Sequence, residues 1–190
     1  PDYNSSAGGF IISAQKNSVG RSVTFGISYS GTTITNNGST EIYTNTSDIE
    51  CIDIGYDTTN DKAYVWFGKP ESAMSTVTNS SGTTLTNGGI SGNYAFGSAS
   101  GRMQFGNMVY DNTNNRGTIF YRDEGNSDYP TAMAYTVSGD SFTYGTAKVL
   151  ESSACYHING AEGEADSKGT ICVFGNGDNT TLKSTVLSYS

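Results

Sequence analysis

The sequence has few charged residues, one histidine, three cysteines and no apolar run long enough to cross a membrane as a helix. Only 15% of the 190 residues are charged, and 10 Lys and Arg against 18 Asp and Glu give a formal net charge of -8. Binding to a nucleic-acid phosphate backbone requires clustered basic side chains. We therefore expect no nucleic-acid partner and no membrane insertion.

The three cysteines are too few for a disulfide-framework domain, and they lack the C-x-x-C spacing of metal sites. We therefore predict no cofactor and no metal. Cys155 and Cys172 flank one predicted hairpin. They would form either a cross-strand disulfide or two small buried side chains, and we favour the buried side chains.

The abundant residues are those of strands and turns. The chain contains 24 Gly and 13 Tyr, and Ser, Thr and Asn supply much of the remainder. Gly and Asn favour turns, whereas Thr, Tyr, Val and Ile suit a half-buried pleated surface. This composition predicts an all-β protein with many short strands.

A short apolar segment recurs along the chain after turns rich in Gly, Asn and Asp. Its four copies cover residues 10–12, 64–67, 118–121 and 170–174. Their centres are Ile11, Val65, Ile119 and Ile171, so the separations are 54, 54 and 52 residues. Such regular spacing indicates a structural repeat.

Each copy also predicts further strands around this segment. A preceding strand forms a hairpin with it, a third strand with alternating apolar residues follows, and a Ser-Gly turn leads to a fourth strand. Four strands in about 50 residues are typical of a β-propeller blade. We predict a single propeller domain of four-stranded antiparallel blades, with another β-repeat array as the alternative. The repeats cover residues 1–47, 48–100, 101–152 and 153–190.

The predicted strands number three, four, four and three, so both terminal blades are expected to be incomplete. An incomplete blade leaves a strand edge open to pairing. Either the sequence belongs to a longer protein, which we favour, or another chain supplies the closing strands.

The third copy resembles the propeller-like repeat of structural and tail-fibre proteins of marine bacteriophages. The resemblance lies in a Tyr-Asp turn at 110–111, a Y-R-D-x-G-N-S-x-Y loop at 121–129, a V-S-G turn at 137–139 and an F-x-x-G-T strand at 142–146. The loop is absent from the second and fourth copies. The resemblance implies a non-enzymatic role on the virion surface, as a tail-fibre, spike or capsid component. Its implied partners are other virion proteins or further copies of the chain, and a host surface glycan.

The same loop supplies the candidate ligand-binding residues Tyr121, Arg122, Asp123, Asn126 and Tyr129. They combine aromatic faces with planar donors and acceptors, a mixture that suits sugar recognition. The alternative, which we favour, is a structural pair between Arg122 and Asp123, with Tyr129 packed on a neighbouring segment.

No catalytic residues are predicted. Cys155 and His157 are two apart in a predicted strand and would share a face, but we expect them to have a packing role. A propeller would allow four carboxylates in predicted hairpin loops to meet at one rim as a catalytic group; we favour the alternative, in which they hydrogen-bond their own turns. These are Asp57, Asp111, Asp123 and Asp166. The alternatives to a virion protein are a secreted carbohydrate-binding propeller and a glycan-cleaving enzyme.

Overall fold

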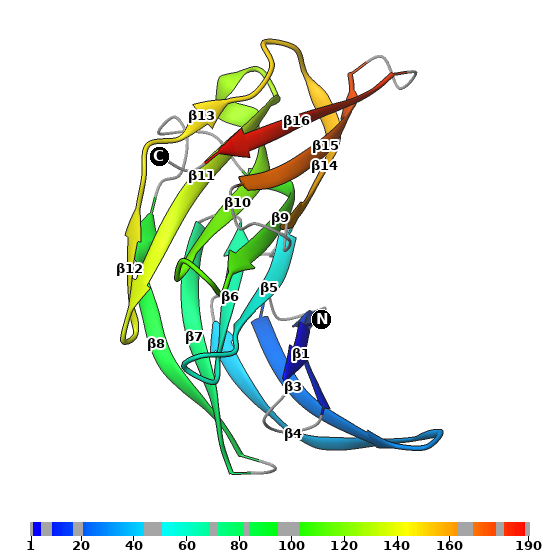
Figure 1. Cartoon of the computed structure of the whole chain (residues 1–190), viewed down its shortest axis with the longest axis vertical. Coiled ribbons are helices and arrows are strands. Elements are labelled where there is room, and N and C mark those ends of the chain that lie inside the picture. Colours follow the sequence, from blue (N-terminus) through cyan, green and yellow to red (C-terminus); the bar gives the residue numbers. More distant parts are fainter. Residues whose placement is uncertain are drawn as a thin grey trace.

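The chain folds as an all-β protein of several antiparallel sheets, none of which closes on itself (Figure 1). This architecture comes from a computed structural model, which describes residues 2–4, 9–16, 21–43, 51–68, 72–81, 84–94, 103–162, 169–177 and 181–188. No helix within these residues has the length and hydropathy needed to cross a membrane.

The first two sheets are four-stranded meanders. Sheet 1 contains, in spatial order, β1 (Asp2–Asn4), β2 (Gly9–Lys16), β3 (Arg21–Ser30) and β4 (Thr33–Tyr43). Sheet 2 contains β5 (Cys51–Asp57), β6 (Lys62–Gly68), β7 (Ser72–Ser81) and β8 (Thr84–Tyr94). The prediction of three strands for the first copy was wrong, because the short strand β1 pairs with β2.

The last two sheets follow the same order. Sheet 3 contains β9 (Met103–Asp111), β10 (Arg116–Asp123), β11 (Tyr129–Ser138) and β12 (Ser141–Tyr144), and β13 (Lys148–Val149) also pairs with β11. A short 3-10 helix, η1 (Glu124–Asn126), connects β10 to β11. Sheet 4 contains β14 (Cys155–Glu162), β15 (Gly169–Asn176) and β16 (Leu182–Ser188).

The predicted Ser-Gly turns form tight hairpins in sheets 1 and 3. Ser30 pairs with Thr33, and Ser138 pairs with Ser141, so two residues make each connection. Gly31 and Gly139 adopt φ values of 59° and 62°. Glycine adopts this left-handed conformation without the steric cost that a side chain would add.

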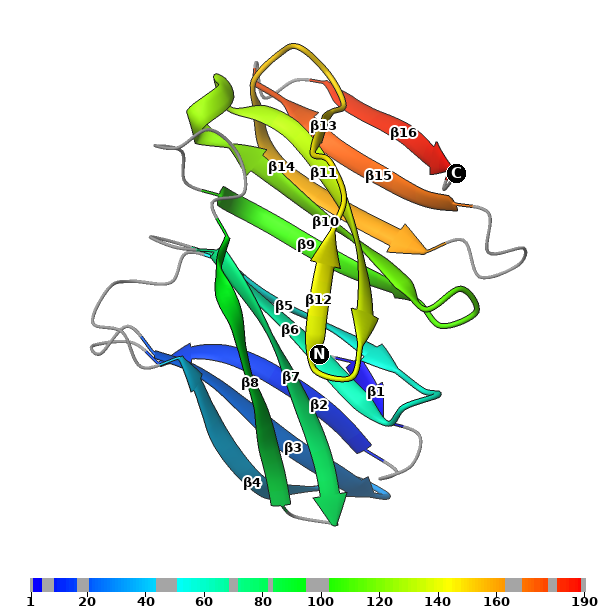
Figure 2. The same cartoon turned by 90° about the vertical axis from the view of Figure 1, so that its left-hand side faces the viewer.

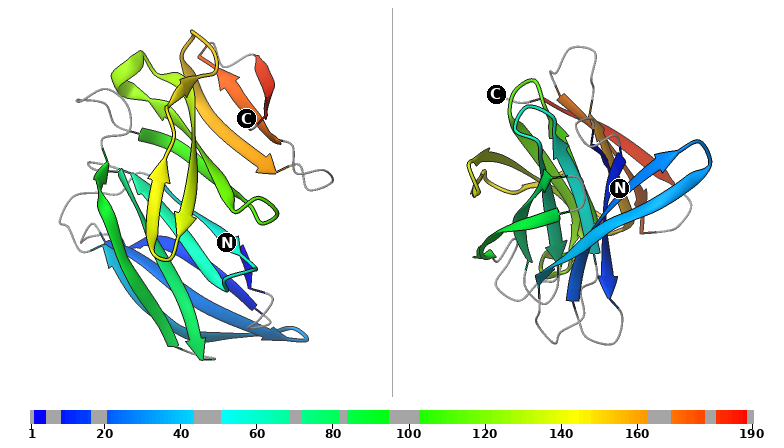
Figure 3. Two further views of the ribbon diagram at one scale, coloured as in Figure 1. Left: turned by 60° about the vertical axis from the view of Figure 1, so that its left-hand side comes forward. Right: turned by 90° about the horizontal axis from the view of Figure 1, so that it is seen from below.

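The sheets pack face to face in chain order, from sheet 1 at the bottom of Figure 2 to sheet 4 at the top. The left view of Figure 3 shows the same succession from another side. Each interface has its own apolar cluster. Ile11 of sheet 1 packs with Val65 and Phe67 of sheet 2, Trp66 packs with sheet 3, and Phe120 of sheet 3 packs with sheet 4. The first strands of successive sheets also lie side by side: β1 with β5, β5 with β9, and β9 with β14.

The faces to which the side chains point correct the spacing between equivalent residues of the repeat. Successive residues of a strand point to opposite faces of a sheet. Val65, Ile119 and Cys172 each pack toward the preceding sheet, whereas Ile11 packs toward the following one. The equivalent residue of the first copy is therefore Ile12. The equivalent residue of the fourth copy is Cys172 rather than Ile171. Structurally equivalent positions are thus 53, 54 and 53 residues apart.

Candidate functional site

The carboxylates of Asp57 and Asp111 organise two equivalent hairpin turns. Oδ1 of Asp57 accepts hydrogen bonds from the backbone N–H groups of Thr59 (2.9 Å) and Asn60 (3.0 Å), and Oδ2 accepts one from Asn60 Nδ2 at 2.7 Å. Asp111 makes the corresponding bonds with Thr113 and Asn114, at 3.0, 3.1 and 2.7 Å. These contacts match the expectation that both carboxylates hydrogen-bond their own turns.

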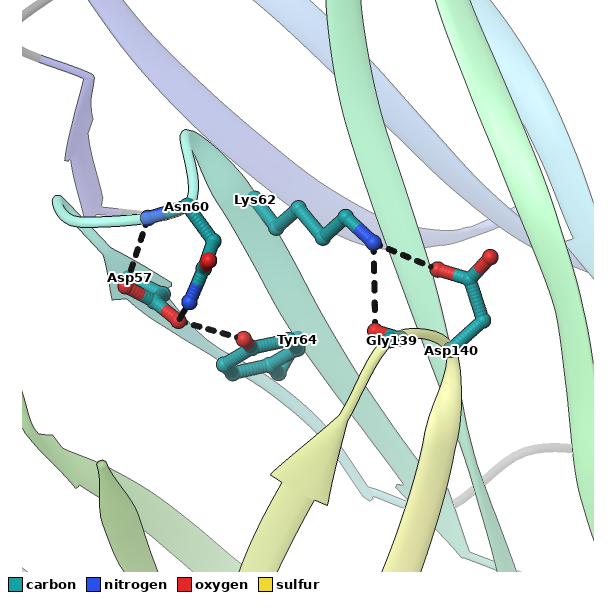
Figure 4. Close-up of polar contacts among 6 residues, drawn as sticks. All are labelled: Asp57, Asn60, Lys62, Tyr64, Gly139 and Asp140. Atoms are coloured by element: carbon teal, nitrogen blue, oxygen red, sulfur yellow. Dashed lines mark hydrogen bonds and ion pairs between the residues drawn. The ribbon is translucent and has the colours of Figure 1, made fainter.

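Asp57 also links sheets 2 and 3. Its Oδ2 accepts hydrogen bonds from the hydroxyls of Tyr64 (2.6 Å; Figure 4) and of Tyr110 in sheet 3 (3.1 Å). Burial alone raises the pKa of Asp57, but the hydrogen bonds from Asn60 and Tyr64 outweigh this effect and hold the pKa below its usual value. Burial, together with the Asp57 carboxylate, raises the pKa of both tyrosines well above the usual range. The network therefore consists of the buried Asp57 carboxylate and two neutral tyrosine hydroxyls that donate to it, and it joins sheets 2 and 3.

Lys62 makes a second, exposed link between the same sheets. Its Nζ lies 2.9 Å from Oδ1 of Asp140 and donates to the carbonyl oxygen of Gly139 at 3.1 Å (Figure 4). The Asp140 side chain is 48% exposed. A pair this exposed stabilises little, because solvent screens it.

A third polar link runs through the first strands of sheets 2, 3 and 4. Oδ2 of Asp53 accepts hydrogen bonds from Asn107 Nδ2 (2.6 Å) and from the backbone N–H of Met108 (2.7 Å). Oδ1 of Asn107 accepts one from the backbone N–H of Gly160 at 2.8 Å. Burial raises the pKa of Asp53 despite these bonds. Asp53 and Asn107 occupy equivalent positions, so this contact repeats from one sheet to the next.

The strongest candidate site is a group of side chains around Arg122, where sheets 3 and 4 meet. We call it the Arg122 cluster, and it consists of Gln104, Phe105, Arg122, Asp128, Tyr156 and His157. β9 supplies the first two residues, β10 supplies Arg122, and β14 supplies Tyr156 and His157. Asp128 follows η1.

The exposed aromatic residues of the cluster lie in two β-bulges. In β9, Phe105 and Gly106 stand opposite the single residue Tyr121, and Phe105 has a φ of 49°. In β14, Tyr156 and His157 stand between the pairs that Cys155 and Ile158 form with β15. A bulge bends its strand and redirects a side chain. Phe105 and Tyr156 are accordingly 43% and 41% exposed although they belong to paired strands.

Arg122 lies at the centre of the cluster. Its guanidinium donates to Gln104 Oε1 at 3.1 Å and forms an ion pair with Asp128 Oδ2 at 2.7 Å. The hydrogen bond with Asp128 raises the pKa of Arg122 above its usual value. Cζ lies 5.7 Å from the ring centroid of Phe105 and 5.9 Å from that of Tyr156, within cation–π range. The guanidinium therefore holds the two exposed rings in place.

His157 extends the aromatic surface. Its ring meets that of Phe105 edge to face, with a centroid distance of 4.9 Å and an interplanar angle of 70°. Asp128 ties the cluster to sheet 4, because its carbonyl oxygen accepts a hydrogen bond from the N–H of Cys155 at 2.9 Å. The cluster thus joins exposed rings and a planar cation on paired strands, an arrangement that can bind a ligand by stacking.

The five residues predicted as a ligand site do not form one surface. Tyr121 is fully buried, and its hydroxyl has no hydrogen-bond partner within the described residues. Asp123 is 4% exposed and caps η1 through a 3.1 Å bond from the N–H of Gly125. Strand alternation places these two on the face opposite Arg122. Burial raises the pKa of Asp123.

Asn126 and Tyr129 are half-buried, in η1 and at the start of β11. The predicted ion pair of Arg122 with Asp123 was also wrong, because Arg122 pairs with Asp128. A turn in which Ser127 and Asp128 both have positive φ brings the Asp128 carboxylate to the guanidinium.

The structure decides between a disulfide and two buried thiols for Cys155 and Cys172. Cys155 and Cys172 are free and buried, as small side chains in the interface of sheets 3 and 4. A cross-strand disulfide does not form because Cys155 pairs with Asn176 and Cys172 pairs with Gly160. The expectation that Cys155 and His157 share a face was wrong, since the bulge in β14 buries Cys155 and exposes His157.

Sequence reasoning missed Phe105, Tyr156 and His157 as members of a site. In a regular strand, one residue of each neighbouring pair would point inward, so these residues were not expected to share a surface. A bulge depends on how two strands pair, and the sequence of one strand does not show it. Asp166, the fourth predicted carboxylate, lies outside the described residues. Comparison with known proteins gave no match to a family model, to a curated protein or to a solved structure.

Proposed function

We propose that this chain is a non-enzymatic component of a virion surface, of the tail-fibre, spike or capsid type, and that the Arg122 cluster contacts a glycan of the host surface. The observation that carries the proposal is the pair of facing bulges that exposes Phe105 and Tyr156 around one guanidinium. The virion assignment rests on the resemblance of residues 110–146 to phage tail-fibre repeats. The adjacent loop at 121–129 is its most specific part.

A glycan suits the chemistry of the cluster. Sugar rings present apolar C–H faces that stack on aromatic rings, and hydroxyl groups that accept hydrogen bonds from a guanidinium or an amide. Phe105, Tyr156 and His157 provide the exposed rings. Arg122 and Gln104, held by each other and by Asp128, provide polar groups in fixed positions. A site on paired strands also loses little conformational freedom when a ligand binds.

The carboxylates support a non-enzymatic role. Glycoside hydrolysis requires two carboxyl groups that face the substrate. Asp57, Asp111 and Asp123 each accept hydrogen bonds from their own turn or 3-10 helix, and each is buried. These carboxylate oxygens therefore stabilise the turns and the 3-10 helix.

We further propose that the four sheets are successive blades of a propeller. The adjacent first strands β1, β5, β9 and β14 support this arrangement, because the innermost strands of propeller blades lie side by side around the central channel. Face-to-face packing of consecutive four-stranded meanders supports it as well. Such a stack provides a rigid platform for the cluster.

Binding to host cells or to their purified polysaccharide tests the glycan site. The informative variants are Phe105→Gly, which removes the ring and suits the positive φ, and Tyr156→Ala. Val173→Ala is the matched control, because Val173 is 41% exposed on β15 and lies outside the cluster. Each cluster variant should bind about tenfold more weakly, or about 1.4 kcal/mol. Unchanged binding in both variants would refute the glycan site.

Two further measurements test the remainder of the proposal. Mass spectrometry of purified virions should detect the chain. Detection only in the culture secretome, with glycan binding intact, would instead identify a secreted lectin. Release of reducing ends from host polysaccharide would contradict the non-enzymatic role.

A further inference from the structure

The positive charge of the Arg122 cluster is balanced within the protein. Nη2 of Arg122 lies 2.7 Å from Oδ2 of Asp128, and Nη1 donates to Gln104 Oε1 at 3.1 Å. Nε of Arg122 is buried and has no hydrogen-bond partner in the part of the chain that the structure describes. The guanidinium therefore has a carboxylate partner before any ligand binds.

The carboxylate is the more accessible member of this ion pair. The Asp128 side chain is 35% exposed, whereas that of Arg122 is 16% exposed. Glu124, in η1, lies close enough to attract the guanidinium and adds a second negative charge. The formal net charge of the chain, -8, has the same sign. A ligand that approaches from solvent thus meets negative rather than positive charge.

The groups that remain for a ligand are apolar rings and acceptor oxygens. Phe105 and Tyr156 are 43% and 41% exposed, and such rings stack on the C–H faces of sugars. The ion pair uses Oδ2 of Asp128, and a carboxylate has about four lone-pair sites on its two oxygens. Asp128 can therefore accept hydrogen bonds from sugar hydroxyls while it holds Arg122.

We propose that the glycan bound by the Arg122 cluster is neutral, with a sugar ring stacked on Phe105 and Tyr156 and its hydroxyls donating to Asp128. This inference rests on the proposed function of the cluster as a glycan site. A uronic or sialic acid would place a second anion beside Asp128, or would displace Asp128 and leave that carboxylate without its cation. A neutral hydroxyl does neither.

Anion exchange separates host surface polysaccharide into a neutral and an acidic fraction, and titration calorimetry measures the affinity of the chain for each. The neutral fraction should bind at least about tenfold more tightly. Its affinity should change less than about twofold between about 0.05 and 0.5 M NaCl, because no ion pair forms with the ligand. Recognition of an acidic sugar by Arg122 would instead weaken as salt is added.

Asp128→Asn tests whether this carboxylate sets the preference. Asp128 has a φ of 63°, a conformation that asparagine also adopts. The variant has a neutral, weaker acceptor and no anion, so neutral glycan should bind less tightly and acidic glycan more tightly. The ratio of the two affinities should fall at least about tenfold. Asp140→Asn removes the same charge outside the cluster, at a side chain that is 48% exposed, and should leave the ratio unchanged.

The outcomes separate this inference from the proposed function. Tighter binding of the acidic fraction, weakened by salt and lost in Phe105→Gly, would overturn the neutral ligand and leave the glycan site standing. Equal effects of Asp128→Asn and Asp140→Asn on the ratio would also overturn it. Binding of neither fraction, or binding that Phe105→Gly and Tyr156→Ala both leave unchanged, would refute the glycan site itself and the neutral ligand with it.

Discussion

Replacement of Asp57 by alanine should destabilise the interface between sheets 2 and 3. The Asp57 side chain is fully buried and accepts hydrogen bonds from the Tyr64 hydroxyl at 2.6 Å and the Tyr110 hydroxyl at 3.1 Å. Its removal leaves both hydroxyls buried without their acceptor. The N–H groups of Thr59 and Asn60 also lose their acceptor, but these two residues are exposed and water can replace it.

The expected loss follows from these contacts. A buried donor without a partner costs about 1–3 kcal/mol. Because two hydroxyls lose their acceptor, Asp57→Ala should lower the free energy of unfolding by about 2–6 kcal/mol. Tyr110→Phe removes one of the two bonds without leaving a hydroxyl unpaired, and should cost about 1–1.5 kcal/mol. Asp140→Ala breaks the exposed ion pair with Lys62, and should cost less than about 1 kcal/mol.

The contribution of Asp57 should also depend on pH. The pKa of Asp57 in the folded protein lies below the value of about 3.9 in an unfolded chain. The carboxylate therefore contributes stability that is fully present above the unfolded value and is lost as the pH falls through the folded value. The difference in free energy of unfolding between the wild type and Asp57→Asn should be constant from about pH 5 to 7 and shrink below about pH 4.

Urea unfolding followed by the fluorescence of Trp66 is the appropriate assay. Trp66 is the only tryptophan, is fully buried and packs between sheets 2 and 3. The reasoning fails if Asp57→Ala costs no more than Asp140→Ala. It also fails if the cost of Asp57→Asn increases in acid.

Three further outcomes test the packing. Gly160→Ala should cost about 1–3 kcal/mol, because its Cβ would lie 2.2 Å from the buried ring of Phe120. Gly175→Ala in the same sheet meets nothing within 4 Å and should be neutral or slightly stabilising; equal costs would contradict this account. Burial raises the pKa of Cys155 to about 11 and that of Cys172 to about 12. Both thiols should therefore resist alkylation at pH 8 in the folded protein and react in urea, and rapid native labelling of either would show that the interface of sheets 3 and 4 is open.

Much of the fold could be predicted from local patterns. The four apolar segments lie in β2, β6, β10 and β15, and two of the Ser-Gly turns adopt the positive φ that their glycines suggest. Turn chemistry is local, so the hydrogen bonds of Asp57 and Asp111 to their own turns were also predictable. The count of strands failed at β1, because three residues give no alternation to detect.

The candidate site was predictable only in part. Arg122 was identified from its loop, but its partners come from β9, β14 and the turn after η1. Two of these contacts depend on bulges, in which the pairing between strands shifts by one residue. A sequence pattern with period two cannot show where such a shift occurs.

The sequence by itself determined the all-β class, the period of the repeat and the turns, because strand alternation and turn chemistry are properties of neighbouring residues. Tertiary structure decided which face of each strand meets which sheet, since a shift of one residue reverses every side chain. That is why Cys172, rather than Ile171, stands at the position of Ile119. It also decided that two bulges from different sheets surround one guanidinium.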